Sequence, residues 1–256
     1  MPAEADPLQG ATLAVVLGSG LGGISESFFV RAQRKFQDVP GLDAACTEGH
    51  AGELKLCRVE NRPCLFVCGR RHYYEGQPQQ IATLVEYLHA LGIRRLLLTS
   101  AAGSLTTECA PGSLMLTDSL LDFQFRPPTV PAGGGQSPRR VPGLDGKLQA
   151  ALARAAKRAG VALARGSLAC TAGPLYETRS EVIFLKRLGI STVSMSGAAE
   201  VAAAGEFGIQ IASVVLVTNW ATGSSGARLK HADVLDRGRR TADDLKRVIV
   251  QLVTDS

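Results

Sequence analysis

Short apolar runs alternate with longer amphipathic segments along most of this chain. Most of the apolar runs end in glycine or in small polar residues, and they lie at residues 11–17, 63–68, 95–100, 113–120, 166–172, 191–195 and 210–218. Short, uniformly apolar runs predict strands that are buried on both faces of a sheet. The runs at 53–60 and 63–68 flank Asn61-Arg62-Pro63 and predict a β-hairpin.

Segments with apolar residues at helical spacing lie between the predicted strands. Asp145 is placed to cap one of them, and Thr178 with Glu181 forms the capping-box pair of another. The predicted helices cover residues 78–91, 145–159, 178–189, 198–207 and a long tail with Val234, Thr241, Leu245, Val248 and Leu252 on one face. Because apolar strands that alternate with helices pack as a middle layer, we expect an α/β protein with a largely parallel or mixed sheet.

A single domain is the simplest organisation of this pattern. The 256 residues, with 45% hydrophobic content, are enough for one large core. No internal repeat or linker divides the chain. We expect residues 11–256 to form the domain after a disordered lead of residues 1–10. The Pro- and Gly-rich residues 122–141 predict a loop that is disordered or responds to a ligand.

The composition argues against several classes of function. The net charge is only +5, and the arginine doublets are too short for a nucleic-acid footprint. We expect no membrane helix because no run of 18 apolar residues exists. The first residues lack the features of a secretory signal, so we expect a cytoplasmic protein. Six cysteines without a C-x-x-C pair and four histidines predict reduced core thiols and no metal site.

A glycine-rich turn, Gly18-Ser19-Gly20-Leu21-Gly22-Gly23, follows the first predicted strand. It fits G-x-G-x-x-G, and Asp38 stands where a dinucleotide-binding fold keeps its ribose-binding acid. A dinucleotide-dependent oxidoreductase is therefore an alternative of a different class, although the polar residues 31–37 are not the apolar second strand that it requires. We favour an anion cradle, in which the glycines expose backbone N–H groups and Ser19 adds a hydroxyl. A purely structural tight turn is the plainer alternative.

Polar residues also follow several other predicted strands. Arg70 and His72 share one face of an extended segment, which places a fixed cation beside a charge-assisted donor, as phosphate binding prefers, and Tyr74 lies two residues further on. A solvated basic strand end is the alternative. Glu177, beside Tyr176, is either a ligand-recognising acid or an acid stabilised by the following helix dipole. Two more strands end in the pairs Met195-Ser196 and Thr218-Asn219.

The order of the polar motifs resembles a known family. The motifs are L-G-S-G-L-G, G-H-A-G-E-L, G-R-R-H-Y-Y-E-G, S-A-A-G-S-L, A-G-P-L-Y-E-T, S-M-S-G-A-A-E and V-T-N. Each is weak alone, but together they resemble the trimeric, low-molecular-mass purine nucleoside phosphorylases. The resemblance implies a single-domain nucleoside-phosphorylase fold with a central mixed, twisted sheet flanked by helices. It also implies reversible phosphorolysis of purine (deoxy)ribonucleosides to free base and (deoxy)ribose 1-phosphate, with phosphate as co-substrate and no cofactor.

The same resemblance implies a site with three parts. The phosphate would be held by Ser19, Arg70, His72, Ser196, the backbone N–H of Ala101 and, with a looser match, His50. The ribose would lie against Tyr74, Met195 and His231, the last near the 5′-hydroxyl. The base would meet Tyr176, Glu177, Thr218 and Asn219. His72, Glu177 and Asn219 are the catalytic candidates.

These residue types suit the implied reaction. Lengthening of the C1′–N9 bond gives the sugar oxocarbenium character, and phosphate then captures it. Asn219 would donate to N7 as negative charge develops on the leaving purine. Glu177 would accept from N1–H, which favours 6-oxopurines such as those of inosine and guanosine over adenine.

The chain departs from the family pattern at several positions. Ser100, Ser194 and Trp220 stand where Asn, Gly and Lys are usual, and residues 197–199 replace T-V-P. The loop at 124–142 is short. In the family this region lends a phenylalanine to the neighbouring subunit, for which Phe123 and Phe125 are the candidates here.

The resemblance also bears on the oligomeric state, and two alternative functions stay open beside it. It implies a homo-oligomer, a trimer or a hexamer of two trimers. A 5′-methylthio-nucleoside phosphorylase is the nearest rival, against which His231 argues because that enzyme needs an apolar pocket. A catalytically silent nucleoside-binding protein is a further alternative, which the departures at Ser100, Ser194 and Trp220 allow.

Overall fold

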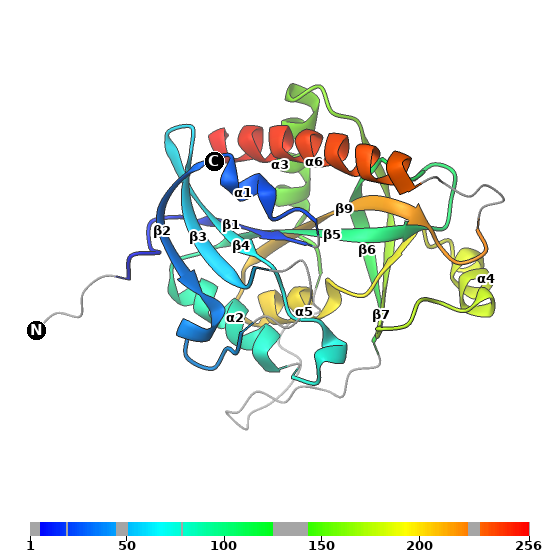
Figure 1. The fold of residues 1–256 in the computed structure, drawn as a ribbon, viewed down its shortest axis with the longest axis horizontal. Coiled ribbons are helices and arrows are strands. Elements are labelled where there is room, and N and C mark those ends of the chain that lie inside the picture. The colour runs from blue at the N-terminus through cyan, green and yellow to red at the C-terminus, as the bar shows by residue number, and fades with distance from the viewer. Residues whose placement is uncertain are drawn as a thin grey trace, which may run out of the picture.

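The computed structural model describes residues 6–18, 20–44, 51–77, 79–124, 143–224 and 231–255, with the backbone alone for 231–239. These ranges contain one nine-stranded sheet and six α-helices (Figure 1). The strands are β1 (Leu13–Leu17), β2 (Phe29–Lys35), β3 (Glu53–Val59), β4 (Arg62–Cys68), β5 (Arg95–Ser104), β6 (Leu114–Phe123), β7 (Leu163–Thr171), β8 (Thr192–Ser194) and β9 (Gln210–Trp220). The helices are α1 (Gly23–Glu26), α2 (Gln79–Ala90), α3 (Gly146–Arg158), α4 (Arg179–Arg187), α5 (Ala198–Glu206) and α6 (His231–Thr254).

The helix caps predicted from the sequence are present. The Asp145 side chain accepts a hydrogen bond from the Leu148 N–H at 2.8 Å and so begins α3. The Glu181 N–H donates to Thr178 Oγ1 at 3.3 Å, and the Thr178 N–H donates back to Glu181 Oε2 at 2.6 Å. These bonds satisfy backbone donors that a helix start otherwise leaves open. The predicted starts of α3 and α4 are confirmed.

The sheet is mixed and partly closed on itself. Its strand order is β2-β3-β4-β1-β5-β8-β7-β6-β9, with an additional β5–β9 pairing. That pairing closes β5, β8, β7, β6 and β9 into a ring, from which β1, β4, β3 and β2 extend as an open sheet. β1 is parallel to both β4 and β5, whereas β3 is antiparallel to both β2 and β4. The expected α/β class with a mixed sheet flanked by helices is confirmed.

Helices cover both faces of the open sheet. Val15 and Val16 of β1 point to opposite faces, as neighbouring strand residues must. Val16 packs in the cluster that contains Leu88 of α2, and α5 lies on the same side. Val15 packs in the cluster that contains Leu152 of α3 and Leu245 of α6. Figure 1 shows α3 and α6 on one side of the sheet and α2 and α5 on the other.

The polar residues of β2 form an edge strand that we did not predict, and this strand bears on the oxidoreductase alternative. β2 pairs antiparallel with β3, and its side chains alternate between exposed and half-buried. An edge strand with an exposed face tolerates polar residues, which explains the missing apolar run. Asp38 lies beyond β2 in a short 3-10 helix. A dinucleotide-binding fold requires this strand beside β1 and parallel to it, so the oxidoreductase arrangement is absent from the described sheet.

The described end of the expected lead is packed against the domain. We expected residues 1–10 to be disordered, but residues 7–10 form a turn and Leu8 is fully buried. Asp6 accepts hydrogen bonds from Arg34 Nη1 at 2.6 Å and from Tyr87 Oη at 2.8 Å. Burial of one leucine is worth about 1.5–3 kcal/mol, enough to hold a short segment. The expectation of disorder is therefore wrong for residues 6–10.

Two strands are longer than the sequence indicated. β5 continues through Ser104, beyond the predicted strand at residues 95–100, with a register shift between Ala102 and Gly103. β6 continues to Phe123, so the predicted loop does not include residues 122 and 123. Residues 125–142, which hold the rest of that loop, lie outside the described chain. None of the described helices is long and apolar enough to span a membrane.

The glycine turn after β1 lies against β5 at close range. A Cβ on Gly18 would come within 2.8 Å of the Thr99 carbonyl oxygen and 3.0 Å of Ser100 Cα. The Gly18 N–H donates to Thr99 Oγ1 at 3.2 Å, and that hydroxyl donates to the Val16 carbonyl at 2.7 Å. Only glycine permits this approach of two backbones without movement.

We therefore predict that Gly18→Ala lowers the free energy of unfolding by about 1–3 kcal/mol, as overpacking does elsewhere. The matched control is Gly22→Ala, whose added Cβ would meet no atom within 4 Å. The control should change stability by less than about 0.5 kcal/mol. Denaturant unfolding with an unchanged slope measures both values, and equal effects of the two changes would contradict the close-approach explanation.

Candidate functional site

The predicted phosphate residues follow neighbouring strands at one edge of the sheet. β1 ends at Leu17, before the glycine turn, and β4 ends at Cys68, just before Arg70. Ala101 lies in the second half of β5, the other neighbour of β1. Ligands of open α/β sheets bind beyond the carboxyl ends of their strands. The fold therefore brings Arg70 and Ala101 to this edge from distant parts of the sequence.

The guanidinium of Arg70 is buried and held at fixed points. Arg70 is 2% exposed, and its Nη2 donates to the Thr99 carbonyl at 2.8 Å. Its Nε lies 3.6 Å from Glu200 Oε1 in a buried ion pair. The structure thus places a permanent positive charge beside the end of β5.

His72 lies in a buried network with two neighbouring charges. Its Nδ1 is 3.1 Å from Glu75 Oε1, and its backbone N–H donates to the same oxygen at 3.0 Å. Glu75 Oε2 pairs with Arg71 Nη1 at 3.2 Å. The His72 ring stacks on Tyr74, with centroids 5.0 Å apart. The network assigns the Nδ1 proton toward Glu75, so that Nε2 presents an acceptor.

The charge expected on His72 is not supported by its surroundings. Burial, followed by the positive charge of Arg70, lowers the pKa of His72 below its ordinary value of 6.5, although Glu75 and Glu200 oppose this shift. His72 is therefore neutral at pH 7. The sequence indicated a charge-assisted donor, and that interpretation is wrong because it ignored the burial of the ring.

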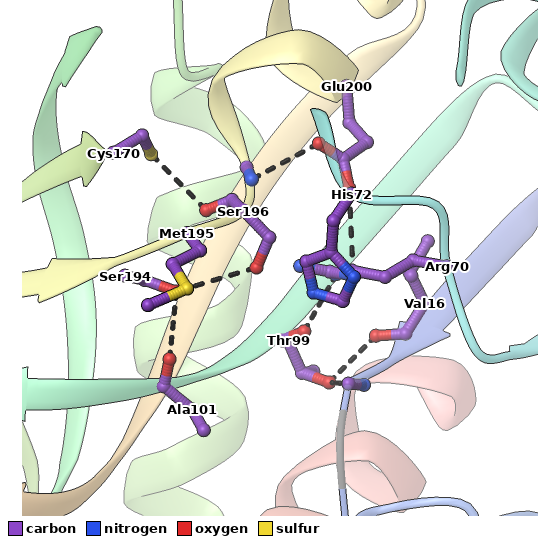
Figure 2. Close-up of polar contacts among 12 residues, drawn as sticks. Val16, Arg70, His72, Thr99, Ala101, Cys170, Ser194, Met195, Ser196 and Glu200 are labelled. Atoms are coloured by element: carbon purple, nitrogen blue, oxygen red, sulfur yellow. Dashed lines mark hydrogen bonds and ion pairs between the residues drawn. The ribbon is translucent and has the colours of Figure 1, made fainter. Parts of the chain in front are cut away.

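A chain of hydroxyls joins the Ser196 turn to β5. Ser194 Oγ donates to the Ala101 carbonyl at 2.8 Å and lies 3.4 Å from Ser196 Oγ. The Ser196 carbonyl accepts a hydrogen bond from Cys170 Sγ at 3.2 Å. All three side chains are buried. Ser194, a departure from the family pattern, thus connects two residues that were predicted to hold phosphate (Figure 2).

The Glu177 carboxylate lies at the end of β7. Glu177 is 8% exposed, and its Oε1 accepts a hydrogen bond from Thr171 Oγ1 at 3.1 Å. Helix α4 starts only after the cap residue Thr178, so Glu177 precedes the helix and is not part of its first turn. Its burial and its hydroxyl partner favour a role in recognition over simple stabilisation of the helix end. Tyr176 beside it is 76% exposed.

The predicted ribose residues Tyr74 and Met195 meet at one glycine. A Cβ on Gly173 would lie 2.7 Å from Tyr74 Cδ1 and 2.8 Å from Met195 Sδ. Gly173 also has a φ of 69°, which favours glycine. Tyr74 comes from the short 3-10 helix after β4 and Met195 from the end of β8, so both side chains meet the Gly173 backbone that follows β7.

Hydrogen bonds at the end of β9 orient the Asn219 amide. Thr218 Oγ1 donates to Asn219 Oδ1 at 2.7 Å, and Asn219 Nδ2 donates to the Trp220 carbonyl at 2.9 Å. Since a carbonyl only accepts, the amide nitrogen must be the atom facing Trp220. The second Nδ2 proton then remains for another acceptor. Trp220, which departs from the family pattern, takes part in this arrangement through its backbone carbonyl.

Some predicted residues cannot be placed and others were missed. Ser19 and His50 lie outside the described chain, as does the side chain of His231. Glu75 and Glu200 were not predicted, although both stand in the quoted motifs. A lone acid in the otherwise apolar segment 198–204 is a signal that could have identified Glu200. Within the described ranges no three His, Cys, Asp or Glu side chains gather as a metal site.

Comparison with known proteins identifies the family of this chain. The chain matches the model of the phosphorylase superfamily over residues 12–254, and it belongs to that superfamily. It is 33% identical over 248 residues to a purine nucleoside phosphorylase of Mycobacterium leprae (strain TN), covering 94% of this chain and 88% of that protein. It is 31% identical over 229 residues to purine nucleoside phosphorylase 1 of Bacillus subtilis (strain 168), covering 88% and 84%.

A mammalian relative extends this similarity. The purine nucleoside phosphorylase of Mus musculus is 30% identical over 249 residues, which cover 93% of this chain and 86% of the mouse protein. The family resemblance indicated by the motifs is confirmed. The role of each site residue stays a prediction.

The neutral state of His72 predicts a pH-dependent stability. Because its folded-state pKa lies below its unfolded value, its contribution is fully present above about pH 6.5 and is lost as the pH falls below that value. We expect the unfolding free energy of the wild type relative to His72→Gln to be larger at about pH 7.5 than at about pH 5. The same substitution at His89, outside this network, is the control. A difference that does not change with pH would contradict the assignment.

Proposed function

We propose that this protein is a purine nucleoside phosphorylase that cleaves purine (deoxy)ribonucleosides reversibly with inorganic phosphate. The observation that carries the proposal is the buried Arg70 guanidinium, which Glu200 links to the Ser196-Gly197 turn at the carboxyl ends of the strands. The full-length similarity to enzymes named purine nucleoside phosphorylase supports it. The products would be the free base and (deoxy)ribose 1-phosphate.

In this mechanism, Arg70 holds phosphate by charge, and Ser196 and the Ala101 N–H donate to its oxygens. The Nε2 of neutral His72 accepts a hydrogen bond from the protonated oxygen of phosphate. As the C1′–N9 bond lengthens, the sugar gains positive charge and the adjacent phosphate stabilises it before bonding to C1′. The electron pair of the broken bond passes to the purine. Tyr74 and Met195 would lie along the ribose, with His231 near the 5′-hydroxyl.

The base would be held by Glu177 and Asn219. The oriented Nδ2 of Asn219 donates its second proton to N7, where negative charge develops during cleavage. Thr171 fixes one oxygen of Glu177, and the carboxylate accepts from N1–H of a 6-oxopurine. Adenine presents an acceptor at N1, so it would leave a buried carboxylate facing a lone pair. We therefore propose inosine, guanosine and their deoxy forms as the preferred substrates.

A phosphate-dependent activity panel tests the function. We expect purified protein to release hypoxanthine from inosine with phosphate and not without it, and to cleave adenosine and 5′-methylthioadenosine at least about tenfold less efficiently because Glu177 is left unpaired. Base release without phosphate would indicate a hydrolase, and binding of hypoxanthine without turnover would indicate a silent binding protein. Preference for methylthioinosine or methylthioadenosine would favour the rival phosphorylase.

A substitution at Glu177 tests the base assignment in the same assay. Glu177→Gln keeps the shape but loses the charged acceptor, so kcat/KM for inosine should fall about 10- to 100-fold. Glu181→Gln is the matched control, because Glu181 caps α4 and is exposed. An equal effect of the two changes, or equal wild-type activity on inosine and adenosine, would refute the role of Glu177.

We further propose that the protein is a homo-oligomer, most simply a trimer. The segment beside Glu177 exposes large apolar side chains at Leu175, Tyr176, Ile183, Phe184 and Leu188, with exposures of 43–83%. These residues continue from the base-binding turn along α4, which lies at the periphery of the molecule in Figure 1. A second copy of the chain would cover this face and complete the open side of the base site.

Sedimentation tests the assembly. The wild type should sediment at three times the chain mass of 26.9 kDa, or at six times that mass for two trimers. Ile183→Glu should shift it toward the monomer because a charge would be buried in the interface. Lys186→Glu, an exposed change on the same helix, should leave the mass unchanged. A monomeric wild type would rule out the proposal.

A further inference from the structure

Arg70 of the candidate phosphate site forms a buried ion pair with Glu200. The Arg70 and Glu200 side chains are only 2% and 7% exposed, and Arg70 Nε lies 3.6 Å from Glu200 Oε1. This separation is too long for a hydrogen bond, and within the described chain Glu200 Oε1 accepts none. The contact therefore depends on charge and not on a directional bond.

The other oxygen of Glu200 holds the opposite side of the same site. Oε2 accepts a hydrogen bond from the Gly197 N–H at 3.1 Å. Gly197 follows Ser196 directly and has a φ of 118°, so the turn that presents the Ser196 hydroxyl is anchored by Glu200. Figure 2 shows Glu200 reaching both Arg70 and the backbone nitrogen beside Ser196.

The setting of Glu200 makes a purely structural role costly. Its neighbours in α5, among them Ala198, Val201 and Ala204, are buried and apolar. Burying a charge in such surroundings is unfavourable unless an opposite charge compensates it. An uncharged side chain would cap the turn at lower cost. The acid is therefore explained by the cation that it faces.

We infer that Glu200 is a built-in counter-ion and positioning residue of the phosphate site. Through one oxygen it compensates the charge of Arg70 in the phosphate-free protein, and through the other it fixes the Ser196 turn. Inorganic phosphate then arrives as a second anion for the same guanidinium. Glu200 thus stabilises the fold of the site before phosphate binds. It also weakens the binding of phosphate, so that phosphate can dissociate again. The inference rests on the proposed phosphorolysis.

Glu200→Gln separates the charge from the shape. The amide oxygen of Gln can still accept from Gly197, but the negative charge near Arg70 is lost. We expect KM for phosphate to fall about tenfold, because the attraction of Arg70 for an anion is no longer offset, while KM for inosine is unchanged. Without phosphate the variant should unfold at a lower temperature than the wild type, and saturating phosphate should raise its Tm by more.

Two further variants separate the charge of Glu200 from its role as the acid that caps α5. Glu181→Gln makes the same change at the same position of α4, where the acid accepts from Thr178, and it should leave KM for phosphate within about twofold, as a distant surface change does. Glu200→Ala removes the Gly197 acceptor as well as the charge. Its phosphate KM should therefore be higher than that of Glu200→Gln, since the Ser196 turn is no longer anchored.

The outcomes distinguish this inference from the proposed function. If the wild type shows no phosphate-dependent cleavage, the proposed function fails. If the wild type is active but Glu200→Gln has an unchanged or raised KM for phosphate, the counter-ion role is overturned. Should the Gln variant fail to fold, Glu200→Asp keeps the charge and draws it back from Arg70. Its phosphate KM should then lie below the wild-type value, and a higher value would overturn the inference.

Discussion

The burial of one permanent positive charge is the constraint on which the site depends. Arg70 has almost no contact with solvent, and a guanidinium cannot shed its charge there. The protein compensates it with a backbone carbonyl of β5 and with the carboxylate of Glu200. Arg70 follows β4 and these two partners lie in β5 and α5, so the position of Arg70 requires that all three elements are in place.

The same requirement organises the rest of the site. Glu200 ties Arg70 to the Ser196 turn, and Ser194 ties that turn to Ala101 in β5. Each of these hydrogen bonds pairs buried polar groups, and leaving such a group unpaired would cost about 1–3 kcal/mol. The strand ends are thereby linked across the sheet. The candidate anion site therefore consists of buried polar groups whose hydrogen bonds and ion pair connect several elements of the sheet.

Much of this site was readable from residue types, and the errors have physical causes. Strand ends at Arg70, Glu177 and Asn219 could be located because apolar runs stop abruptly at polar residues. The charge state of His72 could not, because it depends on burial and on the Arg70 charge, neither of which is local in sequence. Glu75 was overlooked because its partners His72 and Arg71 meet it only through the short helical turn that follows β4. The edge strand β2 was missed because its polar residues hide the alternation of an exposed strand.

The sequence by itself determined the α/β class, the helix caps at Asp145 and Thr178, and the family to which the motifs belong. These features depend on periodicity, on capping chemistry and on the order of short motifs, all of which are local. Only the tertiary structure decided that β2 is an antiparallel edge, that β9 closes a ring with β5, and that Glu200 faces Arg70. Those relations join residues far apart in the chain, and their energies depend on burial and distance, which no local pattern specifies.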